Sequence, residues 1–269
     1  MCMYKKYVCL ISLVLLLGMV GNVLAAVTYN QYSGPANGDW NTAANWALGR
    51  VPTTSDKAGF KTVGGPLVAA STPACGEWTL GGTAGGIVTI NSGGSVQTVV
   101  GSGTGRVSMG QSAGENGTLT MNGGTATFAG ILDLGYAGTG LINLNGGTIN
   151  AADFAMRSSG GVGTMNITAG TLIITGDKTS LINGYVTSGW ITAYGGSGTV
   201  NVSYNTPNVG KTTVTATSGG GLPGKATTPN PANGATSVST TNDLSWAAGS
   251  GATSHNVYFG TTSPGTSRG

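Results

Sequence analysis

A repeat of 23 residues constrains the fold of this chain more than any other feature of its sequence. Three copies begin at Gly117, Gly140 and Gly163, with the sequences GTLTMNGGTATFAGILDLGYAGT, GLINLNGGTINAADFAMRSSGGV and GTMNITAGTLIITGDKTSLING. Looser copies begin at Gly86, with GIVTINSGG, and at Gly198, with GTVNVSYN. A period of this length indicates one supersecondary unit that stacks on copies of itself.

Apolar and polar residues alternate within each copy, which predicts a β-strand with one buried face. Two buried positions, two residues apart, are apolar in all five copies. They are filled by Val88, Leu119, Ile142, Met165 and Val200, and by Ile90, Met121, Leu144, Ile167 and Val202. Glycine pairs at 123–124 and 146–147 follow this strand and indicate turns that need positive φ angles.

Three short strands and three turns fit into one copy, which predicts one coil of a parallel β-helix. Coils stack about 4.8 Å apart, so equivalent side chains form ladders along the axis. We expect such a ladder from Asn91, Asn122 and Asn145, with Thr168 on the next rung. We therefore predict an all-β protein, a β-solenoid of about five coils. The alternative is a β-sandwich of hairpins, which glycine turns also allow but which gives no reason for a fixed period.

Aromatic residues gather in two segments that flank the repeats. They are Trp40 and Trp46 in residues 38–60, and Tyr185, Trp190 and Tyr194 in residues 184–195. The strand edges at the open ends of a solenoid would pair with other chains unless they were covered. We therefore interpret both segments as end caps. The alternative is carbohydrate binding, with sugar rings stacked on Trp40, Trp46, Trp190 and Tyr194.

Residues 1–25 have the pattern of a secretory signal peptide. Lys5 and Lys6 precede an apolar run at 8–20, and a small-residue cleavage site ends at Ala25. The apolar run is too short to cross a hydrocarbon core of about 30 Å, so no membrane span is expected after cleavage. The pattern predicts a protein that is secreted or attached to the cell surface.

Composition divides the chain into five parts. They are the signal peptide (1–25), an N-terminal cap (26–75), the β-solenoid repeats with their C-terminal cap (76–217), a linker (218–231) and part of a second domain (232–269). Two expected strands, at 244–246 and 257–259, fit the first half of an immunoglobulin-like or fibronectin type III sandwich. Such a domain needs about 100 residues, so we expect an incomplete β-sandwich and a longer modular protein.

Residues that carry chemistry are scarce. Charged residues make up 7% of the chain and the formal net charge is +3, which predicts no basic surface for nucleic acid. No spacing typical of metal ligands or of a catalytic triad is present, so we predict no metal, no cofactor and no catalytic residue. Among the carboxylates, only Asp153 and Asp177 are expected near each other, and Arg157 is expected beside Asp133.

Cys75 and His255 receive structural interpretations. Removal of the signal peptide leaves Cys75 as the sole cysteine, which excludes an intramolecular disulfide and predicts a buried thiol. His255 is the one histidine of the chain, and it shares strand parity with Val257 and Phe259. We expect it to pack inside the half-sandwich.

The segments GTLTMNGGT and LINLNGGTI resemble the autotransporter-associated, passenger-type β-helix repeats of secreted bacterial proteins. The segment GDWNTAANWALGRVP resembles the start of such proteins. The segments PANGATSVSTTNDLSW and ATSHNVYFGTT resemble the fibronectin type III-like part of planctomycete-like modular exported proteins. The resemblance implies a secreted β-helix architecture and brings no catalytic or binding residues to this chain.

The sequence as a whole predicts a non-catalytic, secreted or cell-surface module with a structural or adhesive function. The alternative is a carbohydrate-binding module, or the accessory part of a polysaccharide-active enzyme, whose partner would be a cell-surface or extracellular polysaccharide. Ice or mineral binding by a flat threonine face is disfavoured, because Asn143 and Asn166 interrupt the ladder that begins at Thr120.

Overall fold

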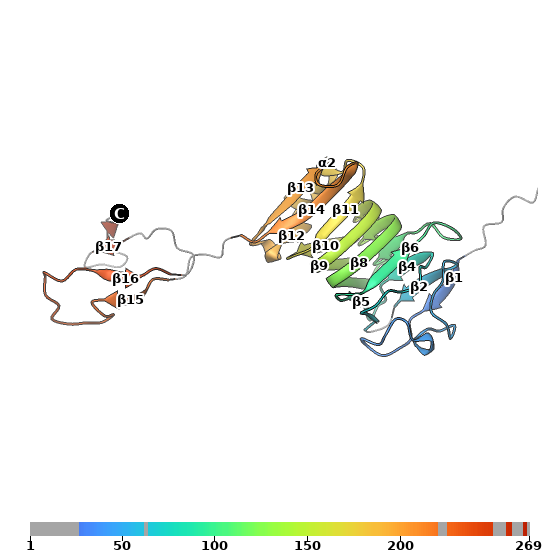
Figure 1. Ribbon diagram of the computed structural model, residues 1–269, viewed down its shortest axis with the longest axis horizontal. Helices are drawn as coiled ribbons and strands as arrows, with labels where there is room; N and C mark the ends of the chain where they lie inside the picture. Colours follow the sequence, from blue (N-terminus) through green and yellow to red (C-terminus); the bar gives the residue numbers. More distant parts are fainter. Residues whose placement is uncertain (1–26, 62–63, 220–224, 250–256, 260–265, 268–269) are drawn as a thin grey trace, which may run out of the picture.

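The computed structural model of the chain describes residues 27–61, 64–219, 225–249, 257–259 and 266–267. Its main feature is a 14-stranded sheet whose neighbouring strands are mostly parallel (Figure 1). The protein is therefore all-β in its main architecture, as predicted. The expected signal peptide and the histidine of the half-sandwich lie outside the described residues.

The large sheet has short strands at both ends and two long strands between them. The first short strands are β1 (Thr28–Gln31), β2 (Asp56–Phe60), β3 (Leu67–Val68), β4 (Glu77–Leu80), β5 (Gly86–Ile90), β6 (Ser95–Thr98) and β7 (Val107–Met109). The long strands are β8 (Asn116–Leu134) and β9 (Thr139–Met156). The last strands are β10 (Val162–Ile167), β11 (Thr171–Thr175), β12 (Ile191–Ala193), β13 (Thr199–Tyr204) and β14 (Lys211–Thr217).

The helical elements are few and short. They are the α-helix α2 (Thr179–Thr187) and two 3-10 turns, Ala43–Asn45 and Tyr194–Gly196. Beyond the large sheet, β15 (Thr227–Asn230) pairs with β16 (Ser245–Ala247), and β17 (Tyr258–Phe259) pairs with β18 (Thr266–Ser267). The two strands expected in the second domain are present as β16 and β17, but each pairs with a different neighbour. The sandwich itself stays a prediction.

Strand pairing follows the 23-residue period. Gly117 in β8 lies beside Gly140 in β9, and Gly140 lies beside Gly163 in β10. The looser copy keeps the same register, because Gly86 in β5 lies beside Gly117. All three pairings are parallel. The alignment predicted for these four copies is therefore confirmed.

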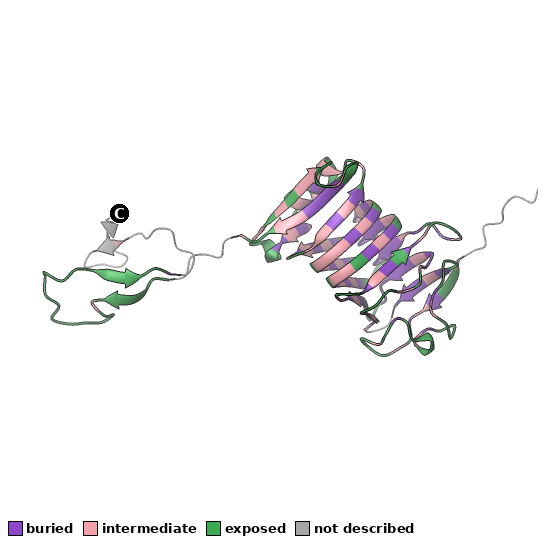
Figure 2. Cartoon of the chain, in the orientation of Figure 1, coloured by how far each residue is buried: buried purple, intermediate pink, exposed green. Residues whose placement is uncertain are grey.

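The long strands β8 and β9 are bent and line the core along their whole length. Their shared register is irregular near Asn122 and again between Phe128 and Ile131. The breaks divide β8 into three stretches, which pair in turn with three separate short strands, β5, β6 and β7. Buried and less buried residues alternate along the strands (Figure 2). The buried side chains from every stretch join one hydrophobic cluster.

A ladder of side-chain amides joins four successive copies at the first turn. Asn122 Nδ2 donates a hydrogen bond to Asn91 Oδ1 at 3.0 Å, and Asn145 Nδ2 donates to Asn122 Oδ1 at 3.1 Å. The Thr168 hydroxyl donates to Asn145 Oδ1 at 3.2 Å. The predicted ladder is therefore confirmed, rung by rung.

The fifth copy does not stack on the fourth, and this expectation is wrong. On the edge of β10 opposite β9, the neighbouring strand is β12, so Met165 lies beside Ile191. Val200 and Val202 lie in β13, which pairs antiparallel with β14, and β14 pairs antiparallel with β11. The alternation that marks a half-buried strand is the same in parallel and antiparallel pairs. The pattern at Gly198 therefore could not show that the chain reverses there.

The start of the parallel sheet and the structure of its C-terminal segment also differ from expectation. The parallel sheet already begins with β1 and β2, ahead of the expected boundary at residue 76, because β2 pairs in register with β4. The segment between the fourth copy and β12 includes α2, where only an aromatic insertion was expected. The helix packs on the core mainly through Ile182, its one buried residue.

Candidate functional site

The N-terminal aromatic residues form a buried cluster. Trp40 and Trp46 are 0% and 2% exposed, and their rings meet edge to face with centroids 4.9 Å apart. Trp46 Nε1 donates a hydrogen bond to the Trp40 carbonyl oxygen at 2.8 Å. Both rings also contact Phe60. A sugar cannot stack on Trp40 or Trp46, because neither ring has an exposed face.

The C-terminal aromatic residues are more open but do not form a shared platform. Trp190 is half-buried and stacks on Tyr185, with centroids 5.5 Å apart. The Arg157 guanidinium lies over the Trp190 ring, 4.2 Å from its centroid. Tyr194 is 37% exposed, and no ring contact joins it to Trp190 in the described part of the chain. The structure therefore does not bring these two proposed sugar-stacking residues together.

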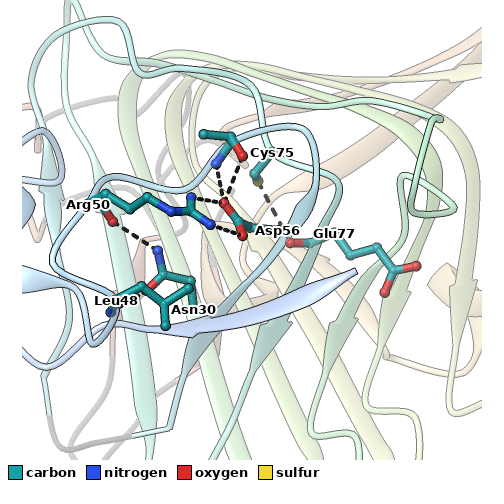
Figure 3. Close-up of polar contacts among 7 residues, drawn as sticks. Asn30, Leu48, Arg50, Asp56, Cys75 and Glu77 are labelled. Carbon is teal, nitrogen blue, oxygen red and sulfur yellow. Dashed lines mark hydrogen bonds and ion pairs between the residues drawn. The ribbon is translucent and has the colours of Figure 1, made fainter. Parts of the chain in front are cut away.

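An ion pair with a buried carboxylate, between Arg50 and Asp56, holds the loop between β1 and β2 (Figure 3). The Asp56 side chain is fully buried and is paired with the half-exposed guanidinium of Arg50, whose NH2 donates to Asp56 Oδ1 at 2.8 Å. The backbone N–H and the hydroxyl of Thr53 also donate to Asp56, at 2.7 and 2.9 Å. Burial acts to raise the pKa of Asp56, but the bonds from Arg50 and Thr53 outweigh it and lower the pKa. We assign this cluster a structural role.

Cys75 is buried, as predicted, and its chemistry is suppressed. Its thiol is 0% exposed and accepts a hydrogen bond from Trp78 Nε1 at 2.9 Å. Burial raises the pKa of Cys75 to about 12. A thiol that stays protonated at neutral pH is a poor nucleophile and a poor metal ligand.

The carboxylates of the repeats do not pair as the sequence suggested. Asp153 forms an ion pair with Lys178 at 2.9 Å, whereas Asp177 accepts hydrogen bonds from Thr179. The expected approach of Asp153 to Asp177 is therefore absent from the contacts of the described residues. Lys178, the residue after Asp177, reaches the carboxylate of Asp153 instead, and an opposite charge is the more favourable neighbour.

Arg157 was expected beside Asp133, and this expectation is wrong. Arg106 takes that place, with its NH2 2.6 Å from Asp133 Oδ2, and the Ser158 hydroxyl donates to Asp133 Oδ1 at 2.8 Å. Arg157 has a positive φ of 58° and donates to the Gly163 carbonyl oxygen at 3.3 Å. The side chain of Arg157 therefore lies away from Asp133. The positive φ of Arg157 could not be read from its position within the repeat.

A polar pocket lies on the outer face of β2, β4 and β7. Its volume is about 280 Å³, and it is lined by Lys57, Glu77, Thr104, Arg106, Ser108, Gln111 and Tyr136. Lys57, Glu77 and Arg106 each precede a core residue by one position, and side chains alternate across a strand. These three charged residues therefore lie on the side of the sheet away from the core.

Each charge in the polar pocket has a partner. Lys57 Nζ lies 2.8 Å from Glu77 Oε2, and the N–H and hydroxyl of Thr104 donate to Glu77 Oε1 at 2.9 and 2.8 Å. Burial acts to raise the pKa of Glu77, but the bonds from Lys57 and Thr104 lower it overall. Arg106 pairs with Asp133 as above and lies over the Tyr136 ring, 5.0 Å from its centroid.

The polar pocket cannot be recognised from the sequence, for a physical reason. Most of its residues lie ahead of Gly117, where the repeats are irregular and alignment by period fails. Lys57, Glu77 and Arg106 are far apart in the chain, and only the register of β2, β4 and β7 brings them together. The one available signal was a charged residue just before an apolar strand residue, repeated three times.

Three further observations concern metal binding, membrane helices and similarity to known proteins. Among the described residues, no group of three or more His, Cys, Asp and Glu side chains is placed to hold a metal ion. No helix in that same part of the chain has the length and apolar character needed to cross a membrane. Comparison of the chain with protein-family models, curated proteins and solved structures found no match.

Proposed function

We propose that the large sheet is a parallel β-helix, and that it serves as a non-catalytic structural or adhesive module outside the cell or on its surface. The observation that carries the proposal is the common register of the copies at Gly86, Gly117, Gly140 and Gly163. Repeats that contact only their neighbours build a stiff, extended body, a suitable form for a spacer or a display surface.

The state of the carboxylates supports a non-catalytic role. In residues 27–61 and 64–219, every carboxylate has a hydrogen-bond or ion-pair partner within the chain. They are Asp39, Asp56, Glu77, Glu115, Asp133, Asp153 and Asp177. Glycoside hydrolysis needs two carboxyl groups facing one bond, about 5–9.5 Å apart. Carboxylates engaged separately in this way are suited to holding the sheet together.

Removal of one copy tests the β-helix. If residues 140–162 form one coil, their deletion joins two coils in register, and the shortened chain should still unfold in one cooperative transition. Deletion of residues 140–151, about half a coil, is the matched control and should abolish that transition because it removes the turn at 146–147 and leaves the copy at Gly163 half a coil out of step with β8. Urea unfolding followed by circular dichroism measures both. If the two deletions are equally disruptive, the β-helix proposal is wrong.

Processing in a bacterial host tests the extracellular location. We expect the exported chain to begin at Ala26, determined by N-terminal sequencing of protein from outside the cytoplasm. Replacement of Ala25 by Asp should block cleavage, because the cleavage site needs a small residue there. An uncleaved wild-type chain that stays in the cytoplasm would contradict the proposed location.

Carbohydrate binding is the second candidate function, and one observation favours it. The aromatic residues first considered for sugar stacking are buried or separated, but the polar pocket offers hydrogen-bonding groups on the outer face of the sheet. The chemistry of this pocket decides what kind of ligand suits it.

A further inference from the structure

We propose that the polar pocket binds one neutral sugar residue of an extracellular polysaccharide. The choice of ligand rests on the proposed extracellular function, whereas the site rests on the geometry of the pocket.

The charges of the polar pocket cancel. Lys57 is paired with Glu77 and Arg106 with Asp133, at 2.8 and 2.6 Å. The side chains of Glu77 and Asp133 are only 12% and 2% exposed, so both carboxylates are held inside the protein beside their cations. A charged ligand would add an unbalanced charge next to these pairs, which is unfavourable in a partly desolvated site. The pocket therefore favours a neutral ligand.

Several hydrogen-bonding groups of the pocket have no partner within the described residues. Arg106 Nε is buried and unpaired. The Ser108 hydroxyl makes no hydrogen bond in this part of the chain, and Gln111 uses only its oxygen, which accepts from Thr79 at 3.4 Å. Of these groups only Arg106 Nε is shielded from water; Gln111 is exposed and Ser108 lines the pocket, so a bound ligand can take the last two as hydrogen-bond partners. A ligand rich in hydroxyl groups provides both acceptors and donors at short spacing.

The size and rigidity of the pocket suit a single ring. Its volume of about 280 Å³ lies just below the range of about 300–1,000 Å³ typical of drug-sized ligands. Its lining residue Ser108 lies in β7, held in fixed register between Thr79 of β4 and Asp133 of β8. All three are nearly fully buried. Side chains held by a sheet present their donors with little loss of conformational freedom on binding.

The first experiment titrates the whole chain with the methyl glycosides of glucose, galactose, mannose and N-acetylglucosamine. Nuclear magnetic resonance follows the side-chain amide of Gln111 and the backbone amide of Ser108. We expect saturable shifts at these two residues with at least one glycoside and a dissociation constant in the millimolar range, as is usual for a small ligand with few contacts. Glucuronate and inorganic phosphate serve as anionic comparisons and should bind more weakly.

Matched variants locate the site. Ser108→Ala and Gln111→Ala should each weaken binding about fivefold, since each removes a neutral hydrogen bond to the ligand. Ser95→Ala and Gln97→Ala are the controls, because both residues lie in β6, away from the pocket, and their side chains make no hydrogen bond in the described structure. Thermal unfolding of all four variants confirms that the sheet is intact.

Three outcomes would overturn the proposal. They are no saturable shift with any of the four glycosides, tighter binding of glucuronate or phosphate than of every glycoside, and binding that both pocket variants leave unchanged. These outcomes are separate from those of the proposed function. Failure of export or of the 140–162 deletion contradicts the extracellular β-helical module, whereas a sugar titration without pocket shifts contradicts only the site.

Discussion

The two ends of the large sheet are closed by different kinds of contact. The N-terminal end is filled by a continuous set of buried rings, Tyr32, Trp40, Trp46, Phe60 and Trp78, whose neighbouring centroids lie 4.9–5.8 Å apart. The C-terminal end is closed by α2 and by the antiparallel pair β13 and β14, and its aromatic residues Tyr185 and Trp190 are only half-buried.

This difference shows two ways in which the exposed end of a sheet can be covered. One removes apolar surface from water with large side chains, and the other ends the parallel order with a strand pair that supplies its own backbone hydrogen bonds. Burial of a full aromatic side chain contributes more than partial coverage. We therefore expect the N-terminal end to depend on single side chains much more strongly than the C-terminal end.

The largest effect is expected from Trp40→Ala. Loss of this fully buried ring leaves a cavity beside the rings of Trp46, Phe60 and Trp78, and should lower the free energy of unfolding by about 3–5 kcal/mol. Urea unfolding at neutral pH measures it. Trp40→Phe is the control, and it should cost less because Trp40 Nε1 has no hydrogen-bond partner among the described residues. A loss for Trp40→Ala no greater than that for Trp190→Ala would break the comparison between the ends.

The second effect is the dependence of stability on Asp56. Asp56→Asn removes one partner of a pair in which only the carboxylate is fully buried. It should lower the free energy of unfolding by about 2–3 kcal/mol at pH 7, less than for a wholly buried pair because Arg50 is half-exposed. The surface control Asp39→Asn, in the same segment, should change it by no more than about 0.5 kcal/mol.

The same pair predicts the direction of a pH effect. The pKa of Asp56 is lower in the folded protein, so its contribution is complete above the unfolded value of about 3.9 and is lost as the pH falls through the folded value. The difference between wild type and Asp56→Asn should therefore be constant from pH 7 to about pH 5 and shrink below about pH 3.9. Urea unfolding at pH 7, 5, 3.5 and 2.5 measures it, and a constant difference throughout would contradict the assignment.

The third effect concerns the C-terminal end. Trp190→Ala removes a half-buried ring together with its contacts to Tyr185 and Arg157. The free energy of unfolding should fall by about 1–2 kcal/mol, since the ring is partly in water and a cation–π contact at such a site contributes about 0.5–1 kcal/mol. Trp190→Phe keeps an aromatic face and should lose less. Equal losses for the two variants would show that the ring contacts do not matter there.

The N-terminal end and the repeats were largely predictable from sequence, whereas the C-terminal end was not. Clustered Trp40 and Trp46 indicated a cap because the open strand edges at the end of a solenoid need to be covered. The pairing of Gly117 with Gly140 followed from an equal spacing that few arrangements other than stacking explain. At Gly198 the alternation was correct but the strand direction was hidden, since a strand pattern shows which face is buried and not which way its neighbour runs.

The candidate site was likewise hard to predict from the sequence. A pocket on a sheet is assembled from neighbours in register, and the register of β2, β4 and β7 depends on loops of unequal length between them. The offset between Asp133 and Arg157 failed as well: Arg157 has a positive φ just after β9, and its side chain lies against the Gly163 carbonyl instead. Residues within the regular period, such as Asn122 and Asn145, could be placed from sequence because each turn repeats the same backbone geometry.

The smallest effect tests the region between the two ends. Asn122 is an inner rung of the amide ladder, where it donates to Asn91 and accepts from Asn145, whereas Asn91 only accepts within the ladder. Asn122→Ala breaks two hydrogen bonds at a partly solvated turn and should lower the free energy of unfolding by about 1 kcal/mol, with Asn91→Ala losing about half as much. Urea unfolding of the two variants and of the double variant measures the coupling. If the ladder acts as a unit, the double variant loses less than the sum of the singles, because the bond between Asn91 and Asn122 is counted in both. Strict additivity would show that the rungs stabilise their turns independently of one another.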